Sequence, residues 1–233
     1  MSDIGLSPGV AWAIVVTVFL IFFGLTLAAF LIGSIPFGYI IGRVFYGTDI
    51  RRQGSGNIGA MNALRTMGKG GAIAVLLLDA LKGFIPAFLT LWWFKAGGAG
   101  HLDIDFDPNF PPGAEILAAL IATAAVLGHC YSPWLRFRGG KGVATFFGAL
   151  FGLCWPAGIV AVLGWVAGAA LTRYSSVGSI LGSVLAPIAV FACSRSLPET
   201  AFALFAAAIV ILKHRDNIAR LRAGTEGPIH LSK

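Results

Sequence analysis

Long apolar runs alternate with short polar segments along almost the whole chain. The apolar runs cover residues 11–33, 70–94, 116–128, 143–172, 176–193 and 200–212. A helix needs about 20 apolar residues to cross a bilayer, and the first run meets this length by itself. The pattern predicts an all-α, polytopic membrane protein that forms a single domain over residues 1–233.

The run at 143–172 has two interpretations. It forms either one long helix or two shorter helices broken at Trp155 and Pro156, since proline is tolerated in membrane helices. Two helices give seven crossings and keep the basic tail at 213–233 on the same side as the other basic segments. We therefore expect seven transmembrane helices, with the N-terminus outside and the C-terminus inside. The segment 143–154 is then short for a crossing, and tilted neighbours or a locally thin bilayer must absorb the mismatch.

Positive charge marks one side of this arrangement. Fourteen of the 17 Lys and Arg residues fall in the segments 34–69, 131–142 and 213–233 or at Arg173. The segment 95–115 instead carries Asp103, Asp105, Asp107 and Glu115, and we expect it to form an irregular external loop. Basic segments are retained in the cytoplasm, so the three basic segments are predicted to lie together on the cytoplasmic face.

The composition agrees with a membrane protein. Charged residues make up 12% of the chain, whereas a soluble domain carries about 25%. So few charges cannot cover a water-soluble globule. The net charge of +7 is explained by cytoplasmic retention of basic loops, and we expect no nucleic-acid partner. The three cysteines are widely spaced among apolar residues and predict neither a disulfide framework nor a metal site.

The first polar segment contains the sequence GSGNIGAMN at 54–62, followed by Arg65. Glycines let the backbone turn freely and bring its N–H groups close to an anion. The planar fork of Arg65 is suited to phosphate. A flexible connector with asparagine turns is the alternative interpretation. Because serine, asparagine and glycine occur together between two spans, we expect a binding site that includes Gly54, Ser55, Gly56, Asn57 and Asn62.

The second polar segment has the sequence RFRGGKGVAT at 136–145. A glycine turn that opens a helix can hold a phosphate, because backbone N–H groups and the helix N-terminus attract the anion and Lys141 neutralises it. The spacing is not that of a P-loop. A turn kept inside by its charge is the alternative, but it does not explain the glycines. We expect a site that includes Gly139, Gly140, Lys141, Gly142 and Thr145, with His129 orienting the loop.

The third polar segment, HRDNIARL at 214–221, follows the last apolar run. His214 and Asn217 are three residues apart and share one helix face, with Arg215 between them in sequence. His214 is either a general base or a structural hydrogen-bonding group. Asp79 and Lys82 lie inside the second span, where charges are costly and usually paired. This pair is either structural or in contact with a substrate.

Together these segments resemble the bacterial acyl-phosphate:glycerol-3-phosphate acyltransferase family. The resemblance is carried by GSIPFGYIIGR at 33–43, GSGNIGAMN with Arg65, LDALKGFIPA at 78–87, GHCYSPWLRFRGGKGVAT at 128–145, TRYSSVGS at 172–179 and HRDNIARLRAGTE at 214–226. The motifs occur in order from about residue 30 to residue 226. Met61 stands where threonine is expected, and Asp216 where glutamate is commoner.

The resemblance implies a seven-span enzyme with its site on the cytoplasmic face of the bacterial inner membrane. Such an enzyme transfers a fatty acyl group from acyl phosphate to the sn-1 hydroxyl of glycerol 3-phosphate, giving lysophosphatidic acid and phosphate in the first step of phospholipid synthesis. It implies no metal ion and no cofactor, and it suggests an upstream acyl-phosphate-forming enzyme as a partner. On the matching positions, we expect His214, Asn217, Ser55, Arg65 and Lys141 to be catalytic, and Gly54, Gly56, Asn57, Asn62, His129, Gly139, Gly140, Gly142, Thr145 and Arg215 to bind substrate.

Two other classes of protein are compatible with these polar segments. A small anion transporter or channel suits short helices, basic loops and an intramembrane ion pair, but no inverted repeat is present and the motifs lie at one face, not at mid-depth. A non-catalytic membrane scaffold does not need three glycine-rich motifs. The sequence contains neither a Gly-x-Ser-x-Gly nor an HExxH motif, so a reaction here needs an electrophile that is already activated, such as the carbonyl group of an acyl phosphate.

Overall fold

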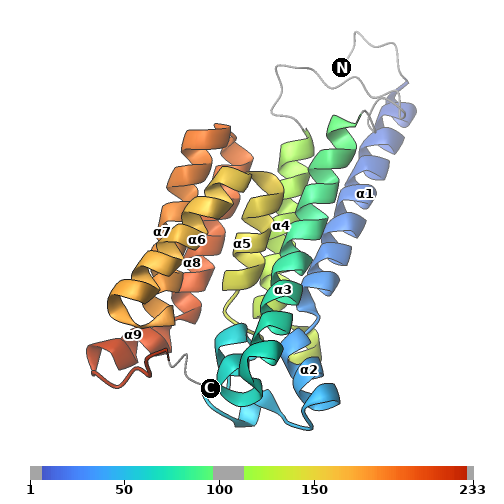
Figure 1. Cartoon of the computed structure of the whole chain (residues 1–233). Coiled ribbons are helices and arrows are strands. Elements are labelled where there is room, and N and C mark those ends of the chain that lie inside the picture. The colour runs from blue at the N-terminus through green and yellow to red at the C-terminus, as the bar shows by residue number, and fades with distance from the viewer. Residues whose placement is uncertain (1–6, 97–112, 230–233) are drawn as a thin grey trace.

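All regular elements in the part of the chain that the structure describes, residues 7–96 and 113–229, are helices (Figure 1). The long helices of this computed structural model are α1 (Pro8–Ser34), α3 (Ala60–Lys95), α4 (Gly113–Cys130), α6 (Trp155–Thr172), α7 (Ser175–Ser194) and α8 (Leu197–Lys213). The short ones are α2 (Phe37–Phe45), η2 (Ile50–Arg52), η4 (Pro133–Leu135), α5 (Val143–Leu153) and α9 (Arg215–Arg222). The all-α prediction is confirmed, whereas most of the expected external loop at 95–115 lies outside the described residues.

Within these residues, five helices are long and apolar enough to cross a membrane: α1, α3, α4, α6 and α7. A sixth span results if α8 and α9 count as one helix bent by 53°. The run at 143–172 forms two helices, because Cys154 leaves the helical conformation and a proline at the start of α6 favours a new helix. α5 has 11 residues, so its length is about 16 Å against a hydrocarbon core of about 30 Å. By length, the structure therefore shows five or six of the seven expected spans.

The long helices lie side by side, and the chain passes back and forth between the two ends of the bundle (Figure 1). α6 packs along α7, α3 along α5, and α1 along α4. Small residues allow close approach between α3 and α5. A Cβ on Gly83 would overlap the carbonyl oxygen of Thr145, and a Cβ on Gly148 would overlap that of Ala80.

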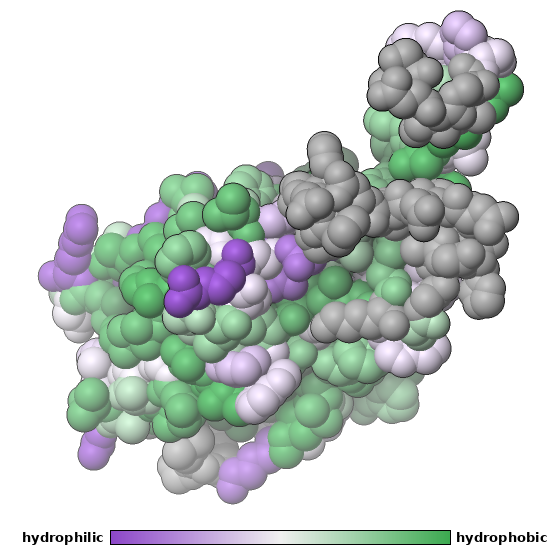
Figure 2. Space-filling model, turned by 90° about the horizontal axis from the view of Figure 1, so that it is seen from above, coloured by the Kyte–Doolittle hydropathy of each residue, from purple (hydrophilic) through white to green (hydrophobic). Residues whose placement is uncertain are grey.

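Apolar side chains cover much of the outside of the molecule. Figure 2 shows the end at which α1 begins, where hydrophobic residues occupy most of the coloured surface. In α1, only Ala29, Gly33 and Ser34 are buried against other helices. The protein core lies mainly between α4, α5 and α8, where the rings of Phe146 and Phe202 pack edge to face at 5.6 Å. Such an apolar exterior around a packed core is that of an integral membrane protein.

Candidate functional site

The three polar segments singled out by the sequence lie at one end of the bundle. In Figure 1 this is the lower end, where α2, the first turns of α3 and α9 are found. Hydrogen bonds join the segments there. Lys141 donates to the side-chain oxygen of Asn217, and Arg65 donates to the carbonyl oxygen of Gly227 at 3.2 Å. Segments far apart in sequence thus form one polar surface.

The loop between η2 and α3 is built around the side chain of Asn62. Its amide nitrogen donates to three carbonyl oxygens at 2.8–3.1 Å, which belong to Ile50, Gln53 and Asn57. Its oxygen accepts a hydrogen bond of 2.8 Å from the N–H group of Ser55. Asn62 is 2% exposed, and its amide is fully used by these contacts. The structure therefore gives Asn62 the position of a residue that shapes the loop.

Two glycines in this loop have backbone angles that side chains disfavour. Gly54 has a φ of 56° and Gly56 a φ of 71°. A Cβ on Gly54 would also overlap the side-chain oxygen of Asn62. Ser55, between the two glycines, is exposed, and the side-chain oxygen of Asn57 accepts a hydrogen bond of 2.8 Å from the N–H group of Gly59. The loop thus presents Ser55 to its surroundings just ahead of the N-terminus of α3.

The turn at 139–142 rests on the end of α4. The N–H group of Gly140 donates to the carbonyl oxygen of His129 at 3.0 Å, and a Cβ on Gly140 would overlap the imidazole ring. Gly142 has a φ of 88° and directly precedes Val143, the first residue of α5. Lys141 lies between these two fixed glycines and reaches α9. The turn therefore places one ammonium group next to the N-terminus of a helix.

Glu226 joins the side chains around Lys141 into one cluster. Its Oε1 accepts hydrogen bonds from Asn217 at 2.6 Å and from Ser176 at 2.9 Å, and its Oε2 accepts one from Arg220 at 2.7 Å. Burial alone would raise the pKa of Glu226, but these three hydrogen bonds outweigh it and lower the pKa. We call Lys141, Ser176, Asn217, Arg220 and Glu226 the Lys141 cluster.

The charge of Lys141 is held in a partly dry environment. Burial lowers the pKa of Lys141 from 10.5 to about 8, while the carboxylate of Glu226 acts in the opposite direction. The nearby cations Arg220 and Arg65 lower it further. At neutral pH the ammonium form still dominates. An anion bound beside Lys141 would stabilise that form, and the concentration of cations favours such an anion.

His214 lies at the bend between α8 and α9 and is 3% exposed. Its Nδ1 atom is 2.7 Å from the carbonyl oxygen of Val210. Because a carbonyl oxygen only accepts hydrogen bonds, Nδ1 carries a proton in this arrangement. In the neutral ring, Nε2 then keeps its lone pair, which is the form of histidine that can accept a proton.

Asp79, Lys82 and His129 form a second, buried polar group, which we call the Asp79 group. The carboxylate of Asp79 and the ammonium of Lys82 are 2.8 Å apart, and each side chain is 2% exposed. Nδ1 of His129 is 3.6 Å from the same carboxylate oxygen. Both charged groups are thus paired and shielded inside the protein. His129, expected to bind substrate, lies beneath the 139–142 turn and is 4% exposed.

Two other expected binding residues lie away from the Lys141 cluster. The side chain of Arg215 is 84% exposed and is 3.6 Å from Asp216. Thr145 is fully buried in the first turn of α5, and its hydroxyl group has no hydrogen-bond partner among the described residues. Within the described residues, the hydrogen bonds and ion pairs of the Lys141 cluster include neither side chain.

Three members of the Lys141 cluster were not selected from the sequence. They are Ser176, Arg220 and Glu226, and all three lie within quoted motifs. A signal was available for Glu226, because a lone carboxylate near the end of a strongly basic tail usually pairs with a cation. Ser176 gave no such signal, because it is one of several serines at the start of an apolar run.

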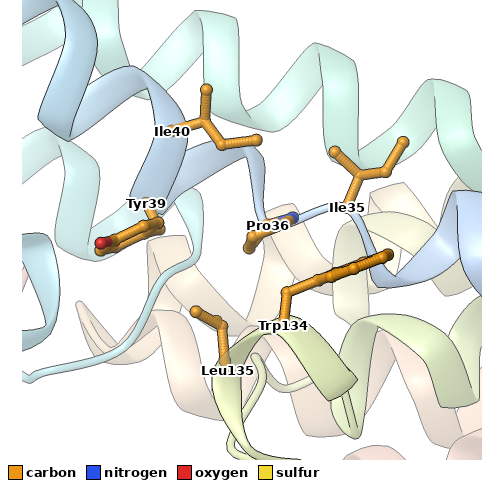
Figure 3. A pocket seen from close by; sticks show the side chains of 6 residues that line it. All are labelled: Ile35, Pro36, Tyr39, Ile40, Trp134 and Leu135. Atoms are coloured by element: carbon orange, nitrogen blue, oxygen red, sulfur yellow. The ribbon is translucent and has the colours of Figure 1, made fainter.

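A separate apolar hollow lies between the start of α2 and η4 (Figure 3). It has a volume of about 360 Å³ and is lined by Ile35, Pro36, Tyr39, Ile40, Trp134 and Leu135. The indole N–H of Trp134 is already used, since it donates to the hydroxyl of Ser34 at 2.7 Å. This apolar lining suits the hydrocarbon chain of a ligand.

Among the described residues, no group of three His, Cys, Asp or Glu side chains could hold a metal ion.

The fold and the site together define an integral membrane protein with a cationic, hydrogen-bonded site at one end of its helices. Residues 23–224 match the profile of the family described as Glycerol-3-phosphate acyltransferase, and the chain belongs to this family of enzymes. The resemblance inferred from the sequence motifs is therefore confirmed.

Individual relatives agree with this assignment. The chain is 44% identical over 205 residues to a glycerol-3-phosphate acyltransferase of Synechococcus sp. (strain JA-2-3B'a(2-13)). The aligned residues cover 86% of this chain and 90% of that protein. It is 44% identical over 210 residues to one from Mesorhizobium japonicum, with 89% and 97% covered. The crystal structure of PlsY (YgiH), an integral membrane glycerol 3-phosphate acyltransferase, in its glycerol 3-phosphate form superposes with a TM-score of 0.76 at 33% identity, with 90% and 96% covered.

Proposed function

We propose that the chain transfers a fatty acyl group from acyl phosphate to the sn-1 hydroxyl of glycerol 3-phosphate, giving lysophosphatidic acid and inorganic phosphate. Membership of the acyltransferase family supports glycerol 3-phosphate as the acceptor. The observation that carries the proposal is the meeting of Lys141, Arg220 and Arg65 at one end of the bundle. Two phosphate-bearing substrates repel each other, and this concentration of cations offsets the repulsion.

The reaction requires mainly that the protein position the two substrates and stabilise negative charge. The sn-1 oxygen attacks the acyl carbonyl carbon, a new ester bond forms, and the bond from that carbon to the phosphate oxygen breaks. An acyl phosphate is a mixed anhydride, so its carbonyl is already activated and phosphate leaves readily. Holding the two reactants in contact and stabilising the developing negative charge can then supply most of the rate enhancement.

The residues divide into two phosphate-binding groups. Lys141 and the N–H groups of the 139–142 turn other than that of Gly140, which His129 already accepts, bind one phosphate, while Arg65, Ser55 and the loop shaped by Asn62 bind the other. The site supports either assignment of the two substrates to these groups. Asn217 orients Lys141, and Glu226 holds Asn217 in turn. The acyl chain lies in apolar surroundings, for which the hollow beside Trp134 is a candidate.

The proton of the attacking hydroxyl has two routes. Nε2 of His214 can accept it, or a phosphate oxygen of a substrate can do so. The variant His214→Ala separates these routes. A modest loss of activity with an unchanged pH–rate profile would exclude His214 as the general base, whereas loss of the acidic limb of the profile would support it.

We also propose seven crossings, with the N-terminus outside and the site on the cytoplasmic side of the bacterial inner membrane. The gathering of the basic segments at one end of the bundle supports this orientation. An upstream enzyme that forms acyl phosphate is then the expected partner, because a reactive mixed anhydride must be supplied on the same side of the membrane as the site.

The decisive experiment mixes the purified protein in detergent with acyl phosphate and glycerol 3-phosphate. The proposal expects release of inorganic phosphate that requires both substrates, together with formation of lysophosphatidic acid. Phosphate release without the acceptor would point to a hydrolase. Movement of labelled glycerol 3-phosphate into sealed vesicles without any chemistry would instead support an anion transporter.

A further inference from the structure

Lys82 connects α3 to the break between α1 and α2. Its ammonium group donates to the carbonyl oxygen of Ile35 at 2.8 Å and pairs with Asp79 at 2.8 Å. Ile35 follows the last turn of α1, and its carbonyl oxygen also accepts a hydrogen bond of 3.1 Å from the N–H group of Phe37. The ammonium of Lys82 therefore ties α3 to the turn between α1 and α2 and also pairs with a buried carboxylate.

His129 continues this contact path toward the 139–142 turn. Its Nδ1 lies 3.6 Å from the carboxylate of Asp79, and its carbonyl oxygen accepts the hydrogen bond from Gly140. The imidazole ring packs so closely on Gly140 that a Cβ there would overlap it. The turn that carries Lys141 thus rests on a histidine that faces the buried ion pair.

The same stretch of α3 also fixes the helix on the other side of Lys141. Gly83 directly follows Lys82 and packs against the carbonyl oxygen of Thr145, in the first turn of α5. The position of Lys141 is therefore constrained from both ends, by His129 before the turn and by α5 after it. Residues 79–83 of α3 contact both supports, since Asp79 lies beside His129 and Gly83 packs against α5.

We propose that Asp79, Lys82 and His129 are positioning residues that set the location of Lys141 through the 139–142 turn. None of them needs to touch a substrate. Burying a charged pair is costly, and a pair with a purely structural role can often be replaced by uncharged residues without loss. A positioning role predicts that such a replacement preserves the fold but impairs substrate binding. The kinetic part of this inference rests on the proposed transferase function.

The test is the double variant Asp79→Asn with Lys82→Met, which removes both charges together and leaves neither unpaired. We expect a folded protein whose kcat/KM falls by about 10- to 100-fold, mostly through KM for one phosphate substrate, because small displacements of a binding group have effects of this size. The single variant Lys82→Arg should keep KM within about 3-fold of the wild-type value, since a guanidinium can donate to both Asp79 and Ile35. Should the double variant not fold, His129→Gln, which removes the ring beneath Gly140, is expected to raise the same KM.

Glu115→Gln is the matched control. Glu115 lies at the opposite end of α4 from His129 and accepts a hydrogen bond of 2.5 Å from Ser196. It also loses a charge in a partly buried contact, yet its KM values should stay at the wild-type level. The inference is overturned if the folded double variant keeps wild-type KM values, or if Glu115→Gln loses as much. An equal fall in kcat with unchanged KM would also overturn it.

A second readout does not depend on turnover. The rate at which the amine of Lys141 reacts with an acylating reagent, followed by mass spectrometry as a function of pH, reports the environment of Lys141. The double variant and His129→Gln should change this titration curve, whereas Glu115→Gln should not. If the wild-type protein shows no transfer, the proposed function fails while this readout still tests the positioning role. Identical titration curves of Lys141 in the wild type and in all the variants would exclude the positioning role.

Discussion

The ammonium group of Lys141 donates a hydrogen bond to the side-chain oxygen of Asn217, which lies 76 residues further along the chain. The amide nitrogen of Asn217 in turn donates to Glu226 at 2.6 Å. A glycine turn between α4 and α5 is thereby tied to α9 and to the segment after it. A substitution that displaces one of these elements is therefore expected to displace the others.

Replacement of Lys141 tests the centre of the proposed site. Lys141→Ala should lower kcat/KM for acyl transfer by about 100- to 1000-fold, because one donor to a developing or bound anion is removed. The protein should still fold, since the turn is held by Gly140 and Gly142. Phosphate release with both substrates is the measurement. Arg195→Gln, an exposed cation that follows α7 at the other end of the bundle, serves as the control, and near-normal turnover of Lys141→Ala would remove Lys141 from the site.

The pH dependence of the reaction should reflect the charge of Lys141. The pKa of Lys141 is lowered to about 8, so the free enzyme loses the cation as the pH rises through this value. The parameter kcat/KM should therefore fall above about pH 8. A bound anion favours the ammonium form, so the alkaline limb of kcat should lie at higher pH. Lys141→Arg should move both limbs upward, because arginine stays protonated throughout the pH range of the assay, and an unmoved limb would mean that another group titrates.

Glu226 should stabilise the fold in a pH-dependent manner. Glu226→Gln removes the partner of Arg220, and we expect a loss of about 1–3 kcal/mol in the free energy of unfolding at pH 7. The pKa of Glu226 is lowered on folding, so its contribution is present above the ordinary value of 4.5 and is lost as the pH falls through the lower folded value. Thermal unfolding curves of variant and wild type should converge below that pH. The exposed Asp216→Asn is the control, and a constant difference down to low pH would contradict the assigned ionisation.

The loop before α3 should depend on the donors of Asn62. Asn62→Asp keeps the size of the side chain but removes the N–H groups that hold three carbonyl oxygens. Because these carbonyl oxygens then lack a donor, the loop should be less stable, with a loss of about 1–3 kcal/mol in the free energy of unfolding. Faster cleavage by trypsin after Arg51 and Arg52 is the expected readout, together with reduced transfer. Thr66→Val, which loses only a hydrogen bond to the carbonyl oxygen of Asn62, should be cut at the wild-type rate.

The orientation in the membrane can be measured by labelling of cysteines. Cys193 is exposed near the end of α7 that lies away from the polar surface, whereas Cys130 and Cys154 are buried. A membrane-impermeant maleimide should label Cys193 in cells whose outer barrier has been opened but whose inner membrane is intact. A cysteine at Arg222, introduced with Cys193→Ala, should react only after that membrane is permeabilised. The reverse pattern would invert the proposed topology.

The sequence was sufficient to predict the helical class, because apolar runs that must satisfy their own backbone hydrogen bonds in lipid can only form helices or closed barrels. The break between α5 and α6 also followed from it, since the charge rule favours two helices over one. Glycine and Asn-rich motifs identified the segments around Asn62 and Lys141. In each case the signal is local, or is carried by charge along the chain.

The tertiary structure alone decided which of these polar side chains meet. The side-chain amide of Asn62 makes hydrogen bonds inside its own loop, and the side chain of Arg215 is exposed although it lies beside His214; substrate binding by either residue stays a prediction. Ser176 and Glu226 join Lys141 because α7 begins at the same face of the bundle at which the segment after α9 lies. The sequence determines which segments are apolar and which are polar, whereas contacts between distant residues depend on how the helices pack, which no local pattern of residues encodes.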